Sequence, residues 1–419
     1  MQLRNMTIYS IFVRNHGGKF AVIEKDIPRI KALGVDMIWL LPIHPIGKKQ
    51  RKGRLGSPYA IADYRSVNPE YGSMEDFRHF ADVVHASGMK LMIDVVYNHT
   101  SPDSWLAQHH PEWFYHKPDG SFGNRIGDWS DIIDLDYSQP GLWDYQIETL
   151  KMWAEVVDGF RCDVAPLVPL SFWLRARKEV EKVRPGCIWL AESVEPEFTR
   201  DNRNRGMISH SDAELYQAFD ICYDYDIYGD FFRYVRGEIC LSDYAAALLR
   251  QESIYPANYV KLRFLENHDR PRMGFLFPEE RLQRNWLSWM FFQKGTSLLY
   301  AGQEWAVQHR PGLFDTDPVP MVGEALYTGL IQELSALKKD NLFAEGVYSL
   351  QTFPNDMMLA RWEKGKRKAI GLFSLKGKTG IVSSELPDGQ YHNLLGNSVL
   401  VENGQISSNG DPIIILIEG

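Results

Sequence analysis

Gly159-Phe160-Arg161-Cys162-Asp163-Val164-Ala165 is a short, mostly apolar stretch that nevertheless carries two opposite charges. Arg161 and Asp163 are two residues apart, so on a strand their side chains lie on the same face. A strand of a parallel barrel is normally a nearly continuous apolar run. The two charges therefore form either a buried structural ion pair or part of a polar functional site.

Three other apolar runs end in the same manner, and this repetition favours the functional interpretation. They are residues 91–99 (LMIDVVYNH), 188–192 (IWLAE) and 264–269 (FLENHD). Polar side chains at the carboxyl ends of several strands are typical of a β/α barrel, whose active site lies on one face of the fold. The pattern therefore predicts a barrel with a site built from several strand ends.

The chain alternates between strand and helix patterns up to about residue 340. Predicted strands fall at 7–14, 35–43, 91–96, 159–163, 187–194, 219–225, 259–266 and 296–300, and predicted helices at 23–33, 73–87, 140–156, 171–183, 228–251, 278–293 and 323–338. We therefore expect an α/β fold, a (β/α)8 TIM barrel over residues 1–340. A short inserted loop subdomain is expected at about 100–137, and the basic run 47–56 is expected to be a solvated loop.

Beyond residue 340 the pattern changes to short alternating strands separated by turns. Pro387-Asp388-Gly389 and Asn409-Gly410 are examples of these turns. Such a pattern is typical of a small antiparallel sheet structure. We expect a C-terminal antiparallel β domain, similar to a β-sandwich, over residues 341–419.

Composition excludes several classes of partner. The formal net charge of -8 disfavours nucleic acid, and no run approaches the roughly 20 apolar residues of a membrane span. The first residues lack the apolar core of a signal peptide, which predicts a cytoplasmic protein.

The four cysteines lack the close paired spacing of a zinc site and are expected to be mainly buried thiols: Cys162, Cys187, Cys222 and Cys240.

Three of the strand-end carboxylates fit one reaction, the hydrolysis of a glycosidic bond. That reaction needs one carboxylate as nucleophile or base and another as proton donor. Arg161 should keep Asp163 ionised, whereas the apolar residues before Glu192 should favour its protonated form. We therefore expect Asp163 to be the nucleophile and Glu192 the general acid/base, with Asp269 as a third carboxylate. An ordinary ion pair in a loop is the alternative for Glu192 alone.

Four ordered stretches resemble the four sequence signatures of the α-amylase family of retaining glycoside hydrolases. They are residues 94–99 (DVVYNH), 159–163 (GFRCD), 191–192 (AE) and 266–269 (ENHD). Residues 57–64, 134–136 and 302–304 add weaker matches. The resemblance implies a retaining mechanism on α-glucosidic bonds, with an α-glucan oligosaccharide as the substrate.

The resemblance also implies a role for each matching residue. Asp163 would be the nucleophile, Glu192 the acid/base, and Asp269 the carboxylate that holds sugar hydroxyls. The residues implied to complete the same sugar subsite are Tyr59, His99, Arg161 and His268. Asp94 would orient the site through Arg161, and Tyr59 would stack on the reacting ring.

The sequence departs from the long-chain α-amylases of the family just after Asp163. Those enzymes commonly place a Lys-His pair there, for sugar binding on the product side and near a calcium ion, whereas this chain has Pro166-Leu167. Asn98 and Asp134 match two calcium ligands of the family, but two ligands fall short of the usual six to eight or so. We expect a hydrogen-bonded clamp at these two residues, with calcium possible and no cofactor required.

The sequence therefore predicts an enzyme that hydrolyses α-1,4 bonds of malto-oligosaccharides or starch-derived glucans through a covalent glycosyl-enzyme. We expect a preference for oligosaccharides over starch, because Pro166-Leu167 removes two polar anchors on the product side. Transglycosylation, conversion of sucrose or trehalose, and cleavage of α-1,6 bonds use the same machinery and are the alternatives. A non-catalytic binding or scaffold protein on this fold is a remoter alternative, since such proteins lose the carboxylates.

Overall fold

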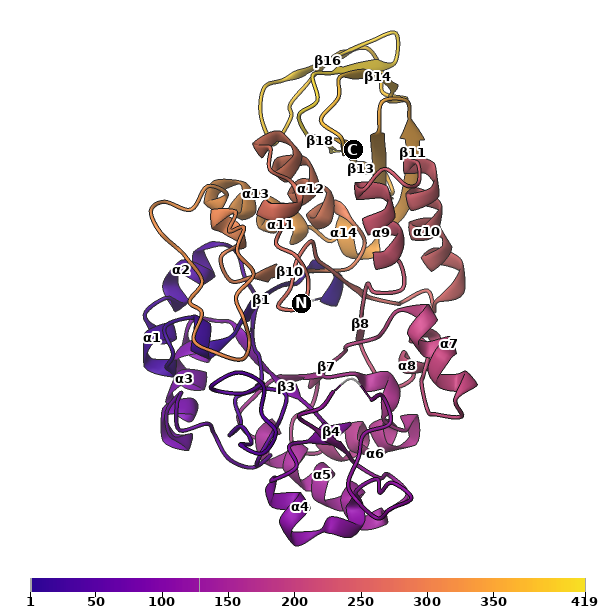
Figure 1. The fold of residues 1–419 in the computed structure, drawn as a ribbon. Helices are drawn as coiled ribbons and strands as arrows, with labels where there is room; N and C mark the ends of the chain where they lie inside the picture. The colour runs from indigo at the N-terminus through magenta and orange to yellow at the C-terminus, as the bar shows by residue number, and fades with distance from the viewer. Residues whose placement is uncertain (1, 128, 419) are drawn as a thin grey trace.

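The computed structural model describes residues 2–127 and 129–418, and its larger part is a closed barrel of parallel strands (Figure 1). Around the barrel the strand order is β1-β10-β9-β8-β7-β6-β3-β2. The strands are β1 Thr7–Ile11, β2 Met37–Leu40, β3 Lys90–Val95, β6 Gly159–Cys162, β7 Ile188–Ala191, β8 Ile221–Tyr223, β9 Lys261–Arg263 and β10 Thr296–Tyr300. Each one falls within or closely overlaps a predicted strand, and the TIM barrel is confirmed.

The register of the barrel brings the charged residues together. Arg161 on β6 lies beside Asp94 on β3, and Cys162 lies beside Ala191 on β7. Asp163 directly follows Cys162 and Glu192 directly follows Ala191, so the two carboxylates lie at the same height at the carboxyl ends of β6 and β7. The strand pairing thus gathers the four residues at one end of neighbouring strands.

Helices surround the barrel and follow the strands along the chain. They are α1 Phe20–Glu24, α2 Ile27–Ala32, α3 Met74–Ala86, α5 Pro140–Ala154, α6 Leu170–Val180, α7 Pro196–Asn204, α8 Asp212–Leu215, α9 Tyr228–Val235, α10 Leu241–Ile254, α11 Met273–Leu276, α12 Glu280–Phe292, α13 Thr328–Lys338 and α14 Leu342–Glu345. A capping box formed by Ser73 and Asp76 begins α3. The single helix predicted at 23–33 is wrong: it is divided into α1 and α2, because Pro28 has no N–H to donate to the carbonyl of Glu24.

The segment between β3 and β6 folds over one side of the barrel mouth. Its two short strands, β4 His99–Thr100 and β5 Ile133–Asp134, pair antiparallel and place His99 beside Asp134. Between them lies helix α4, Trp105–His109. The insertion predicted at about 100–137 therefore begins and ends at one small sheet next to the site.

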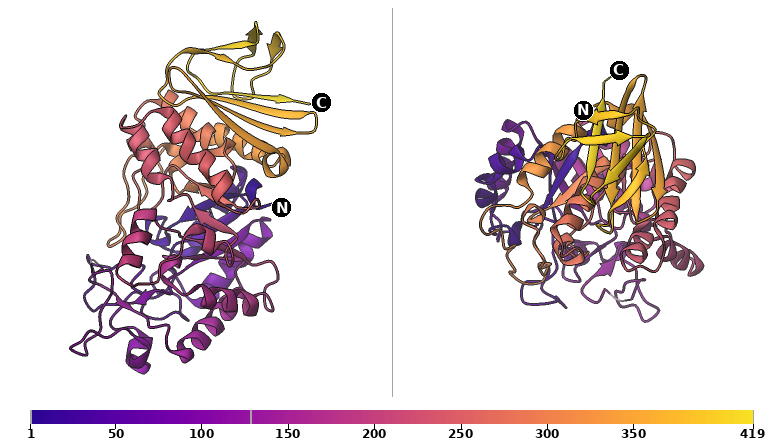
Figure 2. Two further views of the ribbon diagram at one scale, coloured as in Figure 1. Left: turned by 90° about the vertical axis from the view of Figure 1, so that its right-hand side faces the viewer. Right: turned by 90° about the horizontal axis from the view of Figure 1, so that it is seen from above.

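The C-terminal residues form two antiparallel sheets stacked at one end of the barrel (Figure 2). The inner sheet contains β11 Val347–Phe353, β12 Met357–Lys364, β13 Arg367–Ser374 and β18 Ile413–Ile417, and the outer sheet contains β14 Gly380–Ser383, β15 Gly389–Tyr391, β16 Val399–Glu402 and β17 Gln405–Ser408. On β12, Met357 and Leu359 pack against the outer sheet, whereas Met358 and Trp362 belong to the core shared with the barrel. The antiparallel C-terminal part is confirmed, and the boundary at 340/341 stays a prediction.

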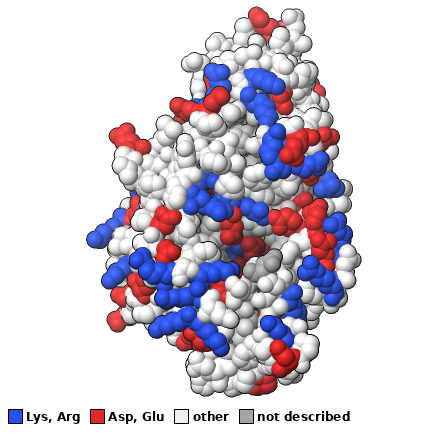
Figure 3. Space-filling view, viewed as in Figure 1, with Lys and Arg blue, Asp and Glu red and all other residues white. Residues whose placement is uncertain are grey.

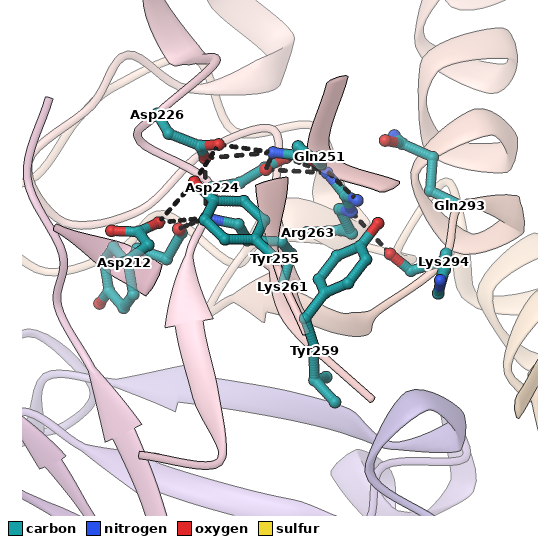
Figure 4. A network of polar contacts seen from close by, with 12 residues as sticks. Asp212, Asp224, Asp226, Gln251, Tyr255, Tyr259, Lys261, Arg263, Gln293 and Lys294 are labelled. Carbon is teal, nitrogen blue, oxygen red and sulfur yellow. Dashed lines mark hydrogen bonds and ion pairs between the residues drawn. The ribbon is translucent and has the colours of Figure 1, made fainter. Parts of the chain in front are cut away.

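A buried polar network joins β9 to the helices outside it (Figure 4). Lys261 is fully buried and forms ion pairs with Asp212 and with Asp226, the latter at 2.8 Å. Arg263 pairs with Asp224 at 2.7 Å and donates to Gln251 on α10. These two cations on one strand face are therefore structural, since their partners lie outside the barrel.

The cysteines follow the expectation in three of four positions. Cys162, Cys187 and Cys222 are buried free thiols, whereas Cys240 is exposed and caps the N-terminus of α10. Among the described residues, no helix is long and apolar enough to cross a membrane.

Candidate active site

A pocket of about 320 Å³ opens where the barrel strands end. On the face shown in Figure 3, acidic side chains gather in a hollow near the centre, with basic side chains around it. The pocket is lined by Lys52, Ser57, Tyr59, His99, Trp129, Asp131, Ile132, Asp163, Val164, Glu192, Asp269, Leu313 and Phe314. All three predicted catalytic carboxylates therefore face the same cavity.

Arg161 lies beneath this pocket and joins the carboxylates to one another. Its Nη1 donates to Oδ1 of Asp94 and to Oδ1 of Asp163, both at 2.8 Å. Its Nη2 lies 2.8 Å from Oε1 of Glu192 as an ion pair, and its Nε donates to the hydroxyl of Tyr223 at 3.2 Å. The guanidinium is fully buried, so its charge is compensated by three carboxylates instead of water.

Val164 turns the chain immediately after Asp163 and also contacts Glu192. Its N–H donates to Oε2 of Glu192 at 2.8 Å. Its φ is 35° and its ψ 45°, a left-handed conformation that is rare for a β-branched residue. Such a conformation costs roughly 1–3 kcal/mol and persists only where the surroundings enforce it. The strain thus occurs at the point where Asp163 and Glu192 are set against each other.

Tyr59, His268 and Asp269 form the opposite wall of the site. The hydroxyl of Tyr59 lies 2.7 Å from Nε2 of His268 and donates to Oδ2 of Asp94 at 3.2 Å. The Tyr59 ring stacks on His268 at 5.6 Å, and the same imidazole nitrogen lies 3.0 Å from Oδ2 of Asp269. The carboxylate of Asp269 is nearly half exposed, at 46%, so it can meet a ligand.

His99 approaches the pocket from the inserted segment. Its ring lies 5.6 Å from Trp129, and its Nδ1 lies 3.2 Å from the amide nitrogen of Asn98. Burial lowers the pKa of His99 to about 4. The imidazole is therefore neutral at neutral pH and can exchange hydrogen bonds with a sugar hydroxyl.

Burial affects the two central carboxylates to different extents. It raises the pKa of Asp163 to about 6, although the charge of Arg161 opposes this shift. Burial raises the pKa of Glu192 further, to about 8. At neutral pH Asp163 is therefore mainly ionised and Glu192 mainly protonated, which is the predicted order of the two groups.

In the opposite wall, the contact between His268 and Asp269 outweighs the effect of burial on their pKa values. The surrounding protein partly desolvates Asp269, which would raise its pKa, but contact with His268 lowers that pKa to about 2. Burial would likewise lower the pKa of His268, but Asp269 raises it. Burial raises the pKa of Asp94 to about 6 against the effect of Arg161. The wall therefore presents a carboxylate that stays ionised.

Several residues that line the pocket could not be predicted from local sequence patterns. Lys52 lies in the basic run 47–56, which was expected to be solvated, but its ammonium lies 3.0 Å from the buried carboxylate of Asp131. Phe314 reaches the pocket from the long connection after β10. The close pairing of loops that are far apart in the chain is not visible in any local pattern.

Asn98 and Asp134 lie at the base of the inserted segment. The backbone carbonyl of Asn98 accepts from the N–H of Leu135 at 3.0 Å, and Oδ2 of Asp134 accepts from the N–H of Arg125 at 2.7 Å. The Arg125 guanidinium lies 3.7 Å from the same oxygen, while Oδ1 of Asp134 is buried without a partner. In residues 2–127 and 129–418, no three Asp, Glu, His or Cys residues form a group that could hold a metal. The hydrogen-bonded clamp at Asn98 and Asp134 stays a prediction.

Two solved structures are similar to this chain along its whole length. An alpha-amylase from Lactobacillus plantarum is 48% identical, with 100% of each chain covered and a TM-score of 0.98. A noncanonic maltogenic alpha-amylase from Thermotoga neapolitana is 34% identical, with 100% of this chain and 99% of that chain covered and a TM-score of 0.89.

Curated relatives match a smaller part of the chain. An alpha-1,4-glucan:maltose-1-phosphate maltosyltransferase from Myxococcus xanthus is 34% identical over 198 residues, which is 42% of this chain and 29% of that protein. The chain covers between 29% and 33% of the length of three such maltosyltransferases.

Family descriptions match both parts of the molecule. Residues 12–124 and 104–340 match "Alpha amylase, catalytic domain", and residues 349–415 match "Bacterial Alpha amylase C-terminal domain". The first of these covers well over half of the sequence and includes every residue that lines the pocket. The chain therefore belongs to the α-amylase family.

Proposed function

We propose that this enzyme cleaves α-1,4 bonds of malto-oligosaccharides through a covalent glycosyl-enzyme on Asp163. One observation carries the proposal: a single buried guanidinium, Arg161, contacts both Asp163 and Glu192 at the floor of the pocket. A retaining glycosidase needs its two carboxyl groups roughly 5–5.5 Å apart, and a shared partner favours so short a separation.

In the first step, Asp163 attacks the anomeric carbon while Glu192 protonates the departing oxygen. The pKa of about 8 for Glu192 keeps its proton available at neutral pH. The pKa of about 6 for Asp163 leaves it ionised and nucleophilic under the same conditions. After the leaving group has gone, Glu192 is ionised and can accept a proton from the incoming acceptor.

The surrounding residues hold the reacting sugar. Asp269 accepts hydrogen bonds from sugar hydroxyls, because His268 keeps it ionised. Tyr59 offers one flat face to the sugar ring, since its other face stacks on His268. Asp94 holds the orientation of Arg161 from behind and does not meet the substrate.

Water is one acceptor for the glycosyl group, and an α-amylase reaction is the result. The full-length similarity to structures named alpha-amylases favours this outcome. Transfer to another acceptor is the second candidate function, because the curated relatives are named maltosyltransferases that use maltose 1-phosphate. Both candidates use the same glycosyl-enzyme and differ only in what attacks it.

Product analysis distinguishes these outcomes in one experiment. Maltoheptaose would be incubated alone, with added maltose, and with inorganic phosphate; sucrose, trehalose and pullulan would be tested separately. Hydrolysis gives only shorter chains, transfer to sugar gives longer ones, and transfer to phosphate gives a glycosyl phosphate. If none of these substrates reacts, the proposed function is wrong.

The first product also reports the stereochemistry. A double displacement returns the starting configuration, so proton NMR of the earliest product should show the α anomer. A β anomer appearing first would mean a single displacement and a different role for Asp163.

A further inference from the structure

The order of strands around the barrel shows which side of the catalytic pocket binds the leaving group and which side binds the glycosyl group. Glu192 follows β7, and β1 lies on the opposite side of the eight-stranded ring. Because Glu192 protonates the departing oxygen, the leaving group lies on the β7 side. The glycosyl part that stays on the enzyme therefore extends toward β1 and its neighbours β2 and β10.

Loops that follow β2 and β10 meet at that end of the pocket. The N–H of Leu55 donates to the carbonyl of Phe314 at 2.9 Å. Gly53 has a φ of 63° and packs so closely that a Cβ there would lie 2.6 Å from Cβ of Phe314. The two loops therefore contact each other directly through their backbones.

A buried arginine anchors both loops from below. Nη1 of Arg14 donates to the carbonyl of Gly56 at 3.2 Å and to the carbonyl of Leu313 at 3.0 Å. Arg14 is only 2% exposed, and Glu70 compensates its charge at 2.9 Å. One charged group thus fixes the distance between the loop after β2 and the loop after β10.

The inserted segment completes the closure. The ammonium of Lys52 crosses to the carboxylate of Asp131 at 3.0 Å, and both side chains line the pocket. The side chain of Asp131 is 5% exposed and that of Lys52 is 36% exposed, so the ammonium is the more accessible of the two groups. The pocket of about 320 Å³ is at the small end of the usual range for ligand sites, roughly 300–1,000 Å³.

We propose that this closure, made by Lys52, Asp131 and Phe314, admits only the non-reducing end of an α-glucan chain and retains a short glycosyl unit. The inference rests on the proposed function and specifies its substrate. A terminal sugar has a free hydroxyl at C4, which can accept from Lys52 and donate to Asp131. An internal sugar carries the rest of the chain at C4, and the paired loops leave no path for that chain.

A substrate with a blocked chain end tests this inference. Two maltoheptaosides with a reducing-end chromophore would be compared, one free and one blocked at C4 and C6 of its terminal sugar. The wild-type enzyme should cleave the blocked compound at least about 100-fold more slowly, as expected when a site built around a hydroxyl meets an analogue without it. Equal cleavage of the two compounds would overturn the inference and leave the proposed function intact.

Variants of Lys52 and Asp131 test whether this pair causes the slow cleavage of the blocked compound. Lys52→Ala and Asp131→Ala should each raise the rate on the blocked compound, relative to the free one, by about tenfold or more. Arg54→Ala is the matched control, because Arg54 belongs to the same loop but pairs with Asp315 at the surface. Thermal unfolding must show that the variants are folded.

Different experimental results would contradict the inference about the chain end and the proposed function. If folded Lys52→Ala and Asp131→Ala enzymes reject the blocked compound as strongly as wild type does, the pair does not form the closure and the inference is wrong. If the free compound and the unblocked glucans are not cleaved at all, the proposed function itself fails.

Discussion

Arg161 controls the charge balance of the site because it is the shared partner of three buried carboxylates. Asp94, Asp163 and Glu192 each lie 2.8 Å from its guanidinium. Three ionised carboxylates around one cation leave an excess of negative charge, and burial makes that excess costly. The excess is relieved when Glu192 holds a proton, which is the state that the first chemical step requires.

Replacement of Asp163 by asparagine tests its role as nucleophile. Covalent catalysis needs a carboxylate oxygen, so Asp163→Asn should lower kcat by at least about 1,000-fold while substrate affinity is largely kept. Steady-state kinetics and isothermal titration with an oligosaccharide measure the two quantities. A variant that keeps more than about a tenth of the wild-type rate would remove Asp163 from that role.

The two raised pKa values predict a bell-shaped dependence of kcat/KM on pH. Asp163 must be ionised, so activity should rise as pH passes about 6; Glu192 must be protonated, so activity should fall as pH passes about 8. Glu192→Gln should remove the limb at high pH along with most of the activity. A profile that is flat between pH 5 and 9 or so would contradict these assignments.

Strands β6 and β9 have similar charge patterns in the sequence but different roles in the structure. Both strands carry two charges on one face, and in both cases those charges are buried. Arg161 on β6 lies beneath the pocket and pairs with Asp163, which lines it, whereas Lys261 and Arg263 on β9 pair with Asp226 and Asp224 in the connection after β8. The sequence places two charges two residues apart in each stretch, but only the partners in the structure show which charges belong to a site.

Other differences have equally local causes. The break between α1 and α2 was present in the sequence as Pro28, so it could have been predicted from the missing N–H. The role of Lys52 could not, because its partner Asp131 lies in a different loop and no sequence spacing connects them. Patterns along the chain identified the strands and the predicted site residues that face the pocket, while contacts between loops required the structure.

The clamp at Asn98 and Asp134 predicts how the inserted segment responds to chelation. Since an amide N–H and the Arg125 guanidinium already compensate Asp134, exhaustive treatment with EDTA should leave both activity and thermal midpoint unchanged. Loss of activity and a lower midpoint, both restored by calcium, would identify a metal site there instead.

At the scale of the whole molecule, the C-terminal sheets complete the core of the barrel. Trp362 on β12 is fully buried, and its Nε1 donates to the carbonyl of Phe292 at the end of α12 at 2.9 Å. Phe373 on β13 packs against Trp289 and Phe292 of the same helix. The inner sheet therefore packs against α12, the helix that directly precedes strand β10.

Removal of the Trp362 side chain tests whether the inner sheet contributes to the stability of the barrel. Trp362→Ala should lower the free energy of unfolding by about 3–5 kcal/mol, as expected for loss of a buried aromatic residue. Ile381→Ala is the control, because Ile381 is 64% exposed on the outer sheet and should change that free energy by less than about 0.5 kcal/mol. Urea unfolding measures both, and equal effects would show that the sheets and the barrel are energetically independent.

Capture of the glycosyl-enzyme tests whether Asp163 forms the covalent intermediate. An α-maltosyl fluoride needs no acid to expel its leaving group, so the Glu192→Gln variant should still form the intermediate but lack the base that resolves it. Mass spectrometry of the digested protein should then show one added maltosyl group on the peptide that contains Asp163, and Asp163→Asn in the same background should abolish it. Turnover of the fluoride without any adduct, or an adduct on another residue, would contradict the proposed mechanism.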